Sequence, residues 1–248
     1  MSSNHAESIA ISGVVNLYKP AGRSSAHYVY RLRRVFGIRK VGHAGTLDPF
    51  ADGVLLACLG RATKLVEKLM ELPKHYRTTL RLGVTNETFD PEHPFVDVPV
   101  SEPPGESALG ACLAGMVGNV MQIPPNFSAI RVGGVQSYVR ARKGKSVELA
   151  ARPVRIDRID LLHYEWPRAT LDIHCGRGTY IRAIARDIGE ALKCGACCET
   201  LTRMAVGPFK VGDSARLESG DEGVRGALVS VEEVTSRLHR ADDAGSAR

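Results

Sequence analysis

Asp48 lies in a glycine-rich stretch, GHAGTLDPFADG, whose composition invites a chemical interpretation. Pro49 follows it and steers the Asp48 backbone away from the helical region, toward an extended or turn conformation. Gly42, Gly45 and Gly53 let the chain bend closely around the carboxylate. A carboxylate fixed on such a loop could act as a nucleophile or a base. It could equally cap nearby N–H groups of an Asp-Pro turn, and the local sequence leaves both interpretations open.

Several other chemistries lack their motifs in this sequence. It contains no G-x-x-x-x-G-K-[ST], no G-x-S-x-G and no H-E-x-x-H, and the segment GRGTY lacks the G-x-G-x-x-G spacing of a dinucleotide site. Cys194 and Cys197 form a C-x-x-C, but a structural zinc site needs four ligands, and no second such pair is present. We therefore expect small buried cysteines, no metal, and chemistry by a carboxylate without a cofactor.

Basic residues are concentrated in two regions of the chain. Lys and Arg outnumber Asp and Glu by 33 to 27 in 248 residues, for a net charge of +6. Residues 1–50 and 131–158 hold most of the imbalance, whereas the charge balance is acidic from residue 213 onward. Such regions suit a polyphosphate partner, although solvated basic faces are common. No apolar run or leader-like N-terminus is evident, so we expect a cytoplasmic protein with no membrane association.

The hydrophobic patterns predict the elements that would position these residues. Residues 25–36 carry a helical apolar stripe with arginines off it, and residues 75–84 and 169–175 alternate as strands. Residues 180–193 form a second amphipathic helix, with Arg182 in its first turn. Because a helix N-terminus favours anions, a carboxylate or phosphate would be stabilised there.

The elements together predict an α/β fold of the α+β type, with a mixed, largely antiparallel sheet flanked by helices. One catalytic domain would occupy residues 10–212, and the proline- and glycine-containing basic segment 124–154 would project from it as an insertion. Residues 213–248 would form a short C-terminal extension with one weak helix and a partly disordered tail.

Seven segments carry a resemblance to a known family. In order, they are GVVNLYKPAGRSS, KVGHAGTLDPFADGVLLACLGRATKL, HYRTTLRLGVTNETFD, QIPPNFSAIRVGGVQSYVRARKG, RPVRI, HCGRGTYIRAIARDIGEALKCGA and LTRMAVGPF. From about residue 13 to residue 209 the sequence resembles the TruB family of tRNA pseudouridine-55 synthases. The resemblance implies the pseudouridine synthase fold, and isomerisation of one uridine in the T-loop of tRNA without cofactor or metal.

The resemblance also implies roles for single residues. Asp48 would be the nucleophile, which decides between the two local interpretations, and Arg182 would pair with it and keep it ionised. Tyr76 would pack on the target uracil and take part in proton transfer, whereas Tyr180 and Leu201 would line the pocket of the flipped base.

His43 would fill the space left by nucleotides that leave the T-loop. Lys19, within a Lys-Pro motif, would support the catalytic loop near the RNA. The segment 124–154 would be a thumb that closes over the T-stem-loop, a kind of RNA read through its shape and backbone. The basic candidates in that segment are Arg131, Arg140, Arg142 and Lys143. The expected partner is tRNA, bound by a monomer with no obligate protein partner.

Two departures limit the resemblance. Tyr18 stands where the family usually has Asp before Lys-Pro, which puts one support contact in doubt. The segment after Phe209 is too short for the complete PUA domain found in many members. Two alternatives remain: a tRNA-folding factor in which catalysis is secondary, and a synthase of the guide-RNA-dependent type. The second is disfavoured because the segments match the stand-alone bacterial form and no large C-terminal RNA-binding domain follows them.

Overall fold

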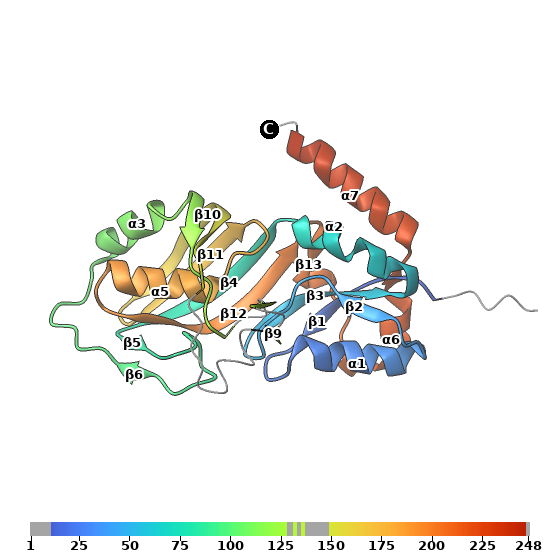
Figure 1. The fold of residues 1–248 in the computed structure, drawn as a ribbon, viewed down its shortest axis with the longest axis horizontal. Helices are drawn as coiled ribbons and strands as arrows, with labels where there is room; N and C mark the ends of the chain where they lie inside the picture. Colours follow the sequence, from blue (N-terminus) through green and yellow to red (C-terminus); the bar gives the residue numbers. More distant parts are fainter. Residues whose placement is uncertain (1–10, 128–130, 133–134, 137–148, 247–248) are drawn as a thin grey trace, which may run out of the picture.

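The computed structural model describes residues 11–127, 131–132, 135–136 and 149–246 (Figure 1). The strands are β1 (Gly13–Lys19), β2 (Val41–His43), β3 (Asp52–Leu59), β4 (Lys74–Leu82), β5 (Val84–Thr85), β6 (Val96–Asp97), β7 (Gly118–Gln122), β8 (Arg131–Val132), β9 (Val135–Gln136), β10 (Arg152–Glu165), β11 (Arg168–Cys175), β12 (Ala196–Val206), β13 (Phe209–Lys210) and β14 (Leu228–Val229). The helices are α1 (Ser25–Phe36), α2 (Val66–Glu71), α3 (Glu106–Ala114), α5 (Ile181–Ala191), α6 (Gly220–Gly226) and α7 (Val231–Ser246), with short 3₁₀ turns η1 (Gly60–Leu65), η2 (Val211–Asp213) and η3 (Leu217–Ser219).

One large sheet organises the molecule. Its strands run in the order β14-β1-β3-β12-β4-β11-β10-β7, and the short strands β13 and β2 pair with β12 and β3. The pairing of β12 with β3 is parallel, at Thr202–Asp52 and Arg203–Gly53, and the other pairs of this sheet in the described residues are antiparallel. The predicted mixed, largely antiparallel sheet with flanking helices is confirmed.

Helices cover both faces of the sheet at the end formed by β1 and β3. Strand residues alternate between faces, so Val15, Leu17 and Leu55 pack with α1 and α6, whereas Val14 and Leu56 pack with α2 and α7. Because β1 and β3 are buried on both sides, they read as nearly continuous apolar runs.

At the other end, where β12, β4, β11 and β10 lie together, the described residues place helices on one face only. There α3 and α5 lie over the sheet (Figure 1). They pack through Leu109, Leu113 and Ile184 onto inward-facing strand residues. The opposite face carries polar pairs such as Arg77–Asp172. The parallel junction of β3 with β12 joins the two ends, and it requires Gly53, because a Cβ there would lie 2.3 Å from the Arg203 carbonyl oxygen.

The predicted elements around the site are confirmed. Helix α1 covers residues 25–36, α5 covers most of 180–193, and β4 and β11 lie at the predicted strands. The C-terminal segment differs from its prediction of one weak helix: it contributes α6, α7 and β14, and β14 pairs with β1 in the main sheet. No helix in the described ranges is both long and apolar enough to span a membrane.

Candidate active site

Asp48 lies on the loop between β2 and β3, and the core fixes this loop on both sides. The Asp48 carbonyl accepts a hydrogen bond from the Ala51 N–H at 3.2 Å, which closes a turn with Pro49 in its second position. Leu47 and Ala51 are buried in the apolar cluster beneath α5. The Ser25 hydroxyl donates to the Leu47 carbonyl and accepts from the Leu47 N–H, at 3.0 and 2.9 Å. The Asp48 side chain therefore stands on a rigid turn.

Arg182 binds the Asp48 carboxylate with two hydrogen bonds. Its Nε donates to Oδ2 at 2.9 Å and its Nη2 to Oδ1 at 3.1 Å. This bidentate geometry is specific to arginine. Arg182 is 3% exposed, whereas the Asp48 side chain is 32% exposed. The hydrogen bonds of the described residues include none from a backbone N–H to the Asp48 carboxylate, so the carboxylate faces a cation instead of capping its own turn.

Asp90 is a second carboxylate on the same arginine. Its Oδ2 lies 3.1 Å from Arg182 Nη1, and its side chain is 3% exposed. The Thr88 hydroxyl and the Glu92 N–H donate to Asp90 Oδ1 at 2.7 and 2.9 Å. Arg182 also donates to the carbonyls of Thr88 and Phe127. Two carboxylates and two carbonyls thus use the donors of one guanidinium.

The charges of this group oppose the cost of burial. Burial disfavours the charged guanidinium, but the attraction of Asp48 and Asp90 outweighs it, so the pKa of Arg182 lies above its ordinary value. Burial raises the pKa of Asp90, and the attraction of Arg182 offsets part of that effect. Both carboxylates therefore depend on the same buried cation.

Arg203 supports the loop that carries Asp48. It is 1% exposed on β12, and its guanidinium donates to the carbonyls of Val54, Gly45 and Thr46 at 2.7, 3.1 and 3.5 Å. Its positive charge lowers the pKa of the neighbouring Tyr76, although the stronger effect of burial raises that pKa overall and keeps the hydroxyl protonated at neutral pH.

Lys19 holds the other side of the loop. Its buried Nζ donates to the carbonyls of Pro20, Arg23 and Pro49 at 2.9, 2.8 and 3.2 Å. Burial lowers the pKa of Lys19 to about 8, while Asp52 and Asp48 oppose that shift. These contacts fit the predicted support role, because Lys19 donates to the carbonyl of Pro49, the residue after Asp48.

Tyr18 makes a support contact of its own in place of the usual family aspartate. Its hydroxyl donates to Asp52 Oδ2 at 2.9 Å, at the start of β3. The Arg216 guanidinium lies 3.8 Å from the Tyr18 ring centre, within cation–π distance. Because Arg216 belongs to the C-terminal segment, that segment contacts the base of the catalytic loop through Tyr18.

The expected pocket residues lie around the loop. Leu201 is buried in the apolar cluster that includes Leu47, and Tyr76 packs against this cluster. Tyr180 precedes α5; its N–H donates to Gln122 Oε1 at 2.8 Å, and the Arg152 guanidinium lies 5.2 Å from its ring centre. Burial, followed by the charge of Arg203, lowers the pKa of His43, so its ring is neutral at pH 7.

The basic thumb residues are described only in part. Arg140, Arg142 and Lys143 lie outside the described residues, and for Arg131 the backbone alone is described, in the β8–β9 hairpin. Their roles stay predictions. In the part of the chain that the structure describes, no group of His, Cys, Asp or Glu side chains is arranged to hold a metal.

Sequence reasoning assigned no role to Asp90 or Arg203. Asp90 lies in the segment TNETFD, and Arg203 lies in LTRMAVGPF. A buried role for Arg203 could have been inferred from its place in β12, because it occupies an inward position of the alternation, where an apolar residue is expected. For Asp90 only the folded loop brings the carboxylate to Arg182.

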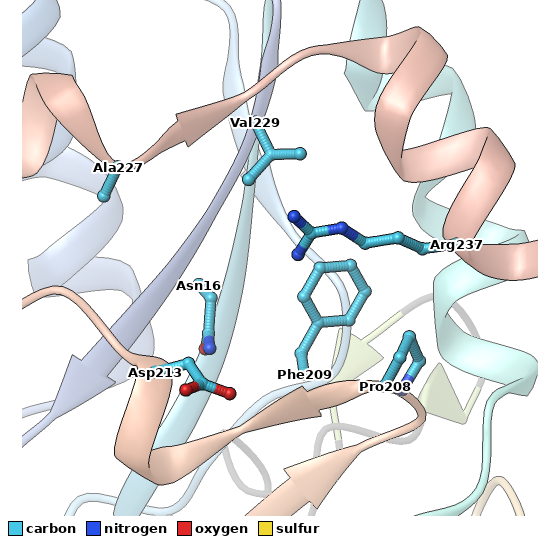
Figure 2. A pocket seen from close by; sticks show the side chains of 7 residues that line it. All are labelled: Asn16, Pro208, Phe209, Asp213, Ala227, Val229 and Arg237. Atoms are coloured by element: carbon cyan, nitrogen blue, oxygen red, sulfur yellow. The ribbon is translucent and has the colours of Figure 1, made fainter.

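A cavity of about 350 Å³ lies apart from this group, beneath α7 (Figure 2). Its lining includes Asn16, Phe209, Asp213 and Arg237, with the Arg237 side chain extending from α7 over Phe209. Asp48, Tyr76 and Arg182 are not among the residues that line it, so this cavity is not the site of the predicted chemistry.

Comparisons with known proteins assign the family. The pattern of the TruB family pseudouridylate synthase (N terminal domain) matches residues 33–181. A tRNA pseudouridine synthase B of Clostridium novyi (strain NT) is 38% identical over 235 residues, covering 93% of this chain and 80% of the relative. A protein of the same name from Mycobacterium tuberculosis (strain ATCC 25618 / H37Rv) is 43% identical over 210 residues, with 83% and 70% covered.

Solved structures agree with the family pattern. A chain in a crystal structure of a Cbf5-Nop10-Gar1 complex superposes with a TM-score of 0.68 at 27% identity, over 91% of this chain and 62% of that one. The chain therefore spans about three fifths of the length of that structural relative. A second, in an H/ACA RNP bound to a substrate RNA containing 2'-deoxyuridine, gives a TM-score of 0.65 at 26% identity. The chain belongs to the TruB family of pseudouridylate synthases, which are isomerases.

Proposed function

We propose that this chain converts uridine 55 in the T-loop of tRNA into pseudouridine, with Asp48 as the nucleophile. The observation that carries the proposal is the asymmetry of the ion pair. Arg182 is buried behind the carboxylate, while Asp48 keeps one third of its side-chain surface open. Relatives named tRNA pseudouridine synthase B, at 38–43% identity, supply the substrate class.

The carboxylate suits the reaction. The N-glycosidic bond must break, the uracil must turn, and a carbon–carbon bond must form in its place. Asp48 can bond to the sugar carbon or to the base as the N-glycosidic bond breaks, and keep that fragment in the site. It leaves again as the carbon–carbon bond forms, while C5 loses a proton and N1 gains one. The rigid turn and the two hydrogen bonds from Arg182 hold the carboxylate in a fixed orientation for this step.

The surrounding residues suit a flipped uridine. Tyr76 offers a ring face and a protonated hydroxyl, and Leu201 offers an apolar wall, which together would replace the stacking lost when the base leaves the RNA. His43, neutral at pH 7, would occupy the space vacated in the loop without acting as an acid. Tyr180 would complete the pocket wall at the start of α5.

The substrate would be held as a folded RNA. Segment 124–154 would close over the T-stem-loop, with Arg131, Arg140, Arg142 and Lys143 near its phosphates. We expect a single chain to suffice for binding and catalysis. The identity to the relatives named tRNA pseudouridine synthase B is 38–43%, against 27% to the chain in the Cbf5-Nop10-Gar1 complex, which supports an enzyme that acts on tRNA by itself.

The decisive experiment uses an unmodified tRNA transcript. Purified protein is incubated with it, and pseudouridine is mapped by carbodiimide-blocked primer extension. We expect a stop at uridine 55 with the wild-type protein and none with Asp48→Asn, because the amide cannot act as the nucleophile. Asp97→Asn, an exposed aspartate on β6, is the matched control and should be fully active. An undiminished stop with Asp48→Asn would refute the nucleophile assignment.

The same variant separates the enzyme from a tRNA-folding factor. Asp48→Asn should still bind tRNA, since the phosphate contacts lie elsewhere. If it accelerates tRNA folding as well as the wild-type protein does, the chain has a folding activity that does not depend on catalysis. If the wild-type protein folds tRNA but yields no product, the folding factor becomes the better description.

A further inference from the structure

The outer face of α1 presents basic side chains that the proposed thumb contact does not use. His27, Tyr30, Arg31 and Arg34 are spaced by three or four residues, so they share one exposed stripe of the helix. The exposed residues Arg23, Arg39 and Lys40 flank its two ends. Tyr30 is 61% exposed. We call these seven residues the α1 face.

The cations of the α1 face are not neutralised by neighbours. In the described ranges, none of its Arg or Lys side chains forms an ion pair, and the sequence contains no Asp or Glu between Glu7 and Asp48. One carboxylate, Glu218 of η3, borders the face, because its charge affects Tyr28 together with those of Arg31 and Arg23. It makes no ion pair with them among the described residues.

Another exposed helix gives the opposite picture. On α7, Arg237 and Arg240 both pair with Glu233, at 2.9 and 3.3 Å. Unpaired arginines repel one another and stabilise a fold little, apart from Arg33 and Arg34, which are well placed at the C-terminal end of the α1 dipole. The unpaired cations of the α1 face are therefore suited to bind an anion from outside the chain.

The α1 face also begins at the catalytic loop. Two hydrogen bonds join Ser25, at the first turn of α1, to Leu47, the residue before Asp48. From there the 12-residue helix extends about 18 Å. An RNA whose loop presents a base to Asp48 continues as a double helix, and α1 offers a straight basic path for it.

We propose that the α1 face binds the phosphates of the RNA stem adjoining the target loop. This inference rests on the proposed function, because it takes the RNA loop to be at Asp48. Arginine suits phosphate through its planar fork of donors, and tyrosine hydroxyls also contact the RNA backbone. Such contacts set affinity and orientation and carry no sequence information.

The test is a salt series of tRNA binding. Unmodified tRNA is titrated with the wild-type protein, with Arg31→Ala/Arg34→Ala, and with Arg237→Ala/Arg240→Ala as a control of equal charge change. We expect the α1 variant to bind roughly tenfold more weakly at about 0.1 M salt, and its log–log salt slope to fall by about 1.4–1.8, since each phosphate contact contributes ~0.7–0.9. The α7 control should match the wild-type protein.

Two further measurements separate the explanations. Arg31→Lys/Arg34→Lys keeps both positive charges, so it should recover most of the log–log salt slope. This recovery shows that the alanine variant loses charge contacts and does not merely fail to fold. A minimal hairpin with the target loop and about three closing base pairs should bind wild type and α1 variant equally, because the stem contact is missing. Turnover at saturating tRNA should stay within about twofold of the wild-type value, because none of these side chains touches the reacting atoms.

Definite results would overturn the proposal. If the α1 variant has the slope of the α7 control, the face does not bind RNA, and an acidic protein becomes its better partner. If the variant is weakened equally on the minimal hairpin, the effect comes from the catalytic loop instead. If the salt slopes of the variants differ as predicted but the wild-type protein makes no pseudouridine, the proposed function fails. The binding of RNA by the α1 face is still supported in that case.

Discussion

At the residue scale, the surroundings of Arg182 support the role proposed for Asp48. A one-to-one buried pair would neutralise Asp48 fully, but Asp90 shares the same guanidinium at 3.1 Å. The buried arginine cannot turn outward, because Thr88 and Phe127 also hold it. We therefore predict that Asp90 is a positioning residue: it would fix the guanidinium that orients Asp48, the proposed nucleophile, without touching the substrate.

Asp90→Asn tests this positioning. We expect kcat to fall by up to roughly a hundredfold, since small displacements of a catalytic group have effects of that size. KM for tRNA should change little, because Asp90 is buried. Arg182 keeps Asp48 as a partner in this variant, so the buried cation stays compensated and the thermal stability should change little.

The control for Asp90→Asn is Asp160→Asn, which breaks an exposed pair with Arg158 on β10. It should leave kcat unchanged. An Asp90→Asn protein with wild-type kcat would contradict the positioning role. A fall in kcat accompanied by a clearly lower Tm would indicate that Asp90 has a structural role instead.

Lys19 gives the site a pH dependence. Its ammonium group has three donors for the carbonyls of Pro20, Arg23 and Pro49, whereas the neutral amine has two. As the pH rises through its pKa of about 8, one support contact of the loop is lost. We expect the single-turnover rate constant of product formation, measured with saturating enzyme, to decrease severalfold between pH 7.5 and 9.

The controls identify the titrating group. Lys74 also has a pKa lowered by burial to about 8, so Lys74→Met must keep the decrease if Lys19 causes it. Lys19→Arg, which stays charged, should not show the decrease.

Buried thiols set the upper limit of this pH range. Burial raises the pKa of Cys58 to about 12, so the folded protein keeps this thiol protonated where an unfolded chain would ionise it. Ionisation of the unfolded chain therefore reduces the stability of the fold as the pH rises above ~9. The window below pH 9 therefore avoids alkaline unfolding.

At the element scale, the sequence predicted what local patterns determine. Helix α1 and strands β4 and β11 follow from their apolar spacing, and α5 places Arg182 in its first turn as expected. The pairing of Arg182 with Asp48, 134 positions away, came only through the family resemblance. No spacing rule contains it, because the contact depends on how β3 and α5 meet across the sheet.

Other features of the elements could not be predicted from local sequence. Arg203 binds three loop carbonyls, and its strand runs parallel to β3 with no space for a side chain at Gly53. Tyr18 forms a contact with Asp52 that the family motif does not imply. These features depend on side chains far apart in the sequence, so they emerge only with the tertiary structure.

At the scale of the whole molecule, the C-terminal extension is a structural part of the fold. Strand β14 pairs with β1 at Val14–Val229 and Val15–Leu228, and α7 buries Val234 and Leu238 against the cluster beneath α2. This arrangement protects the edge of β1, which would otherwise present unpaired backbone groups. The sequence analysis set the extension apart at residue 213 because its charge and weak pattern differ, and these features do not report strand pairing.

Ending the chain after Gly226 tests this arrangement, because it removes β14 and α7. We expect the free energy of unfolding to fall by about 3 kcal/mol or more, since burial of Val234 and Leu238 contributes ~1.5–3 kcal/mol each. Calorimetry should show Tm lowered by on the order of 10 °C. Turnover at 20 °C should persist, because Asp48, Arg182 and Asp90 contact neither element.

The control is a chain that ends after Arg240. It keeps the buried side chains of Val234 and Leu238 and should melt like the full chain. If the chain that ends after Gly226 also melts like the full chain, the extension does not stabilise the sheet. If that chain stays folded but loses turnover, β14 or α7 acts on the site.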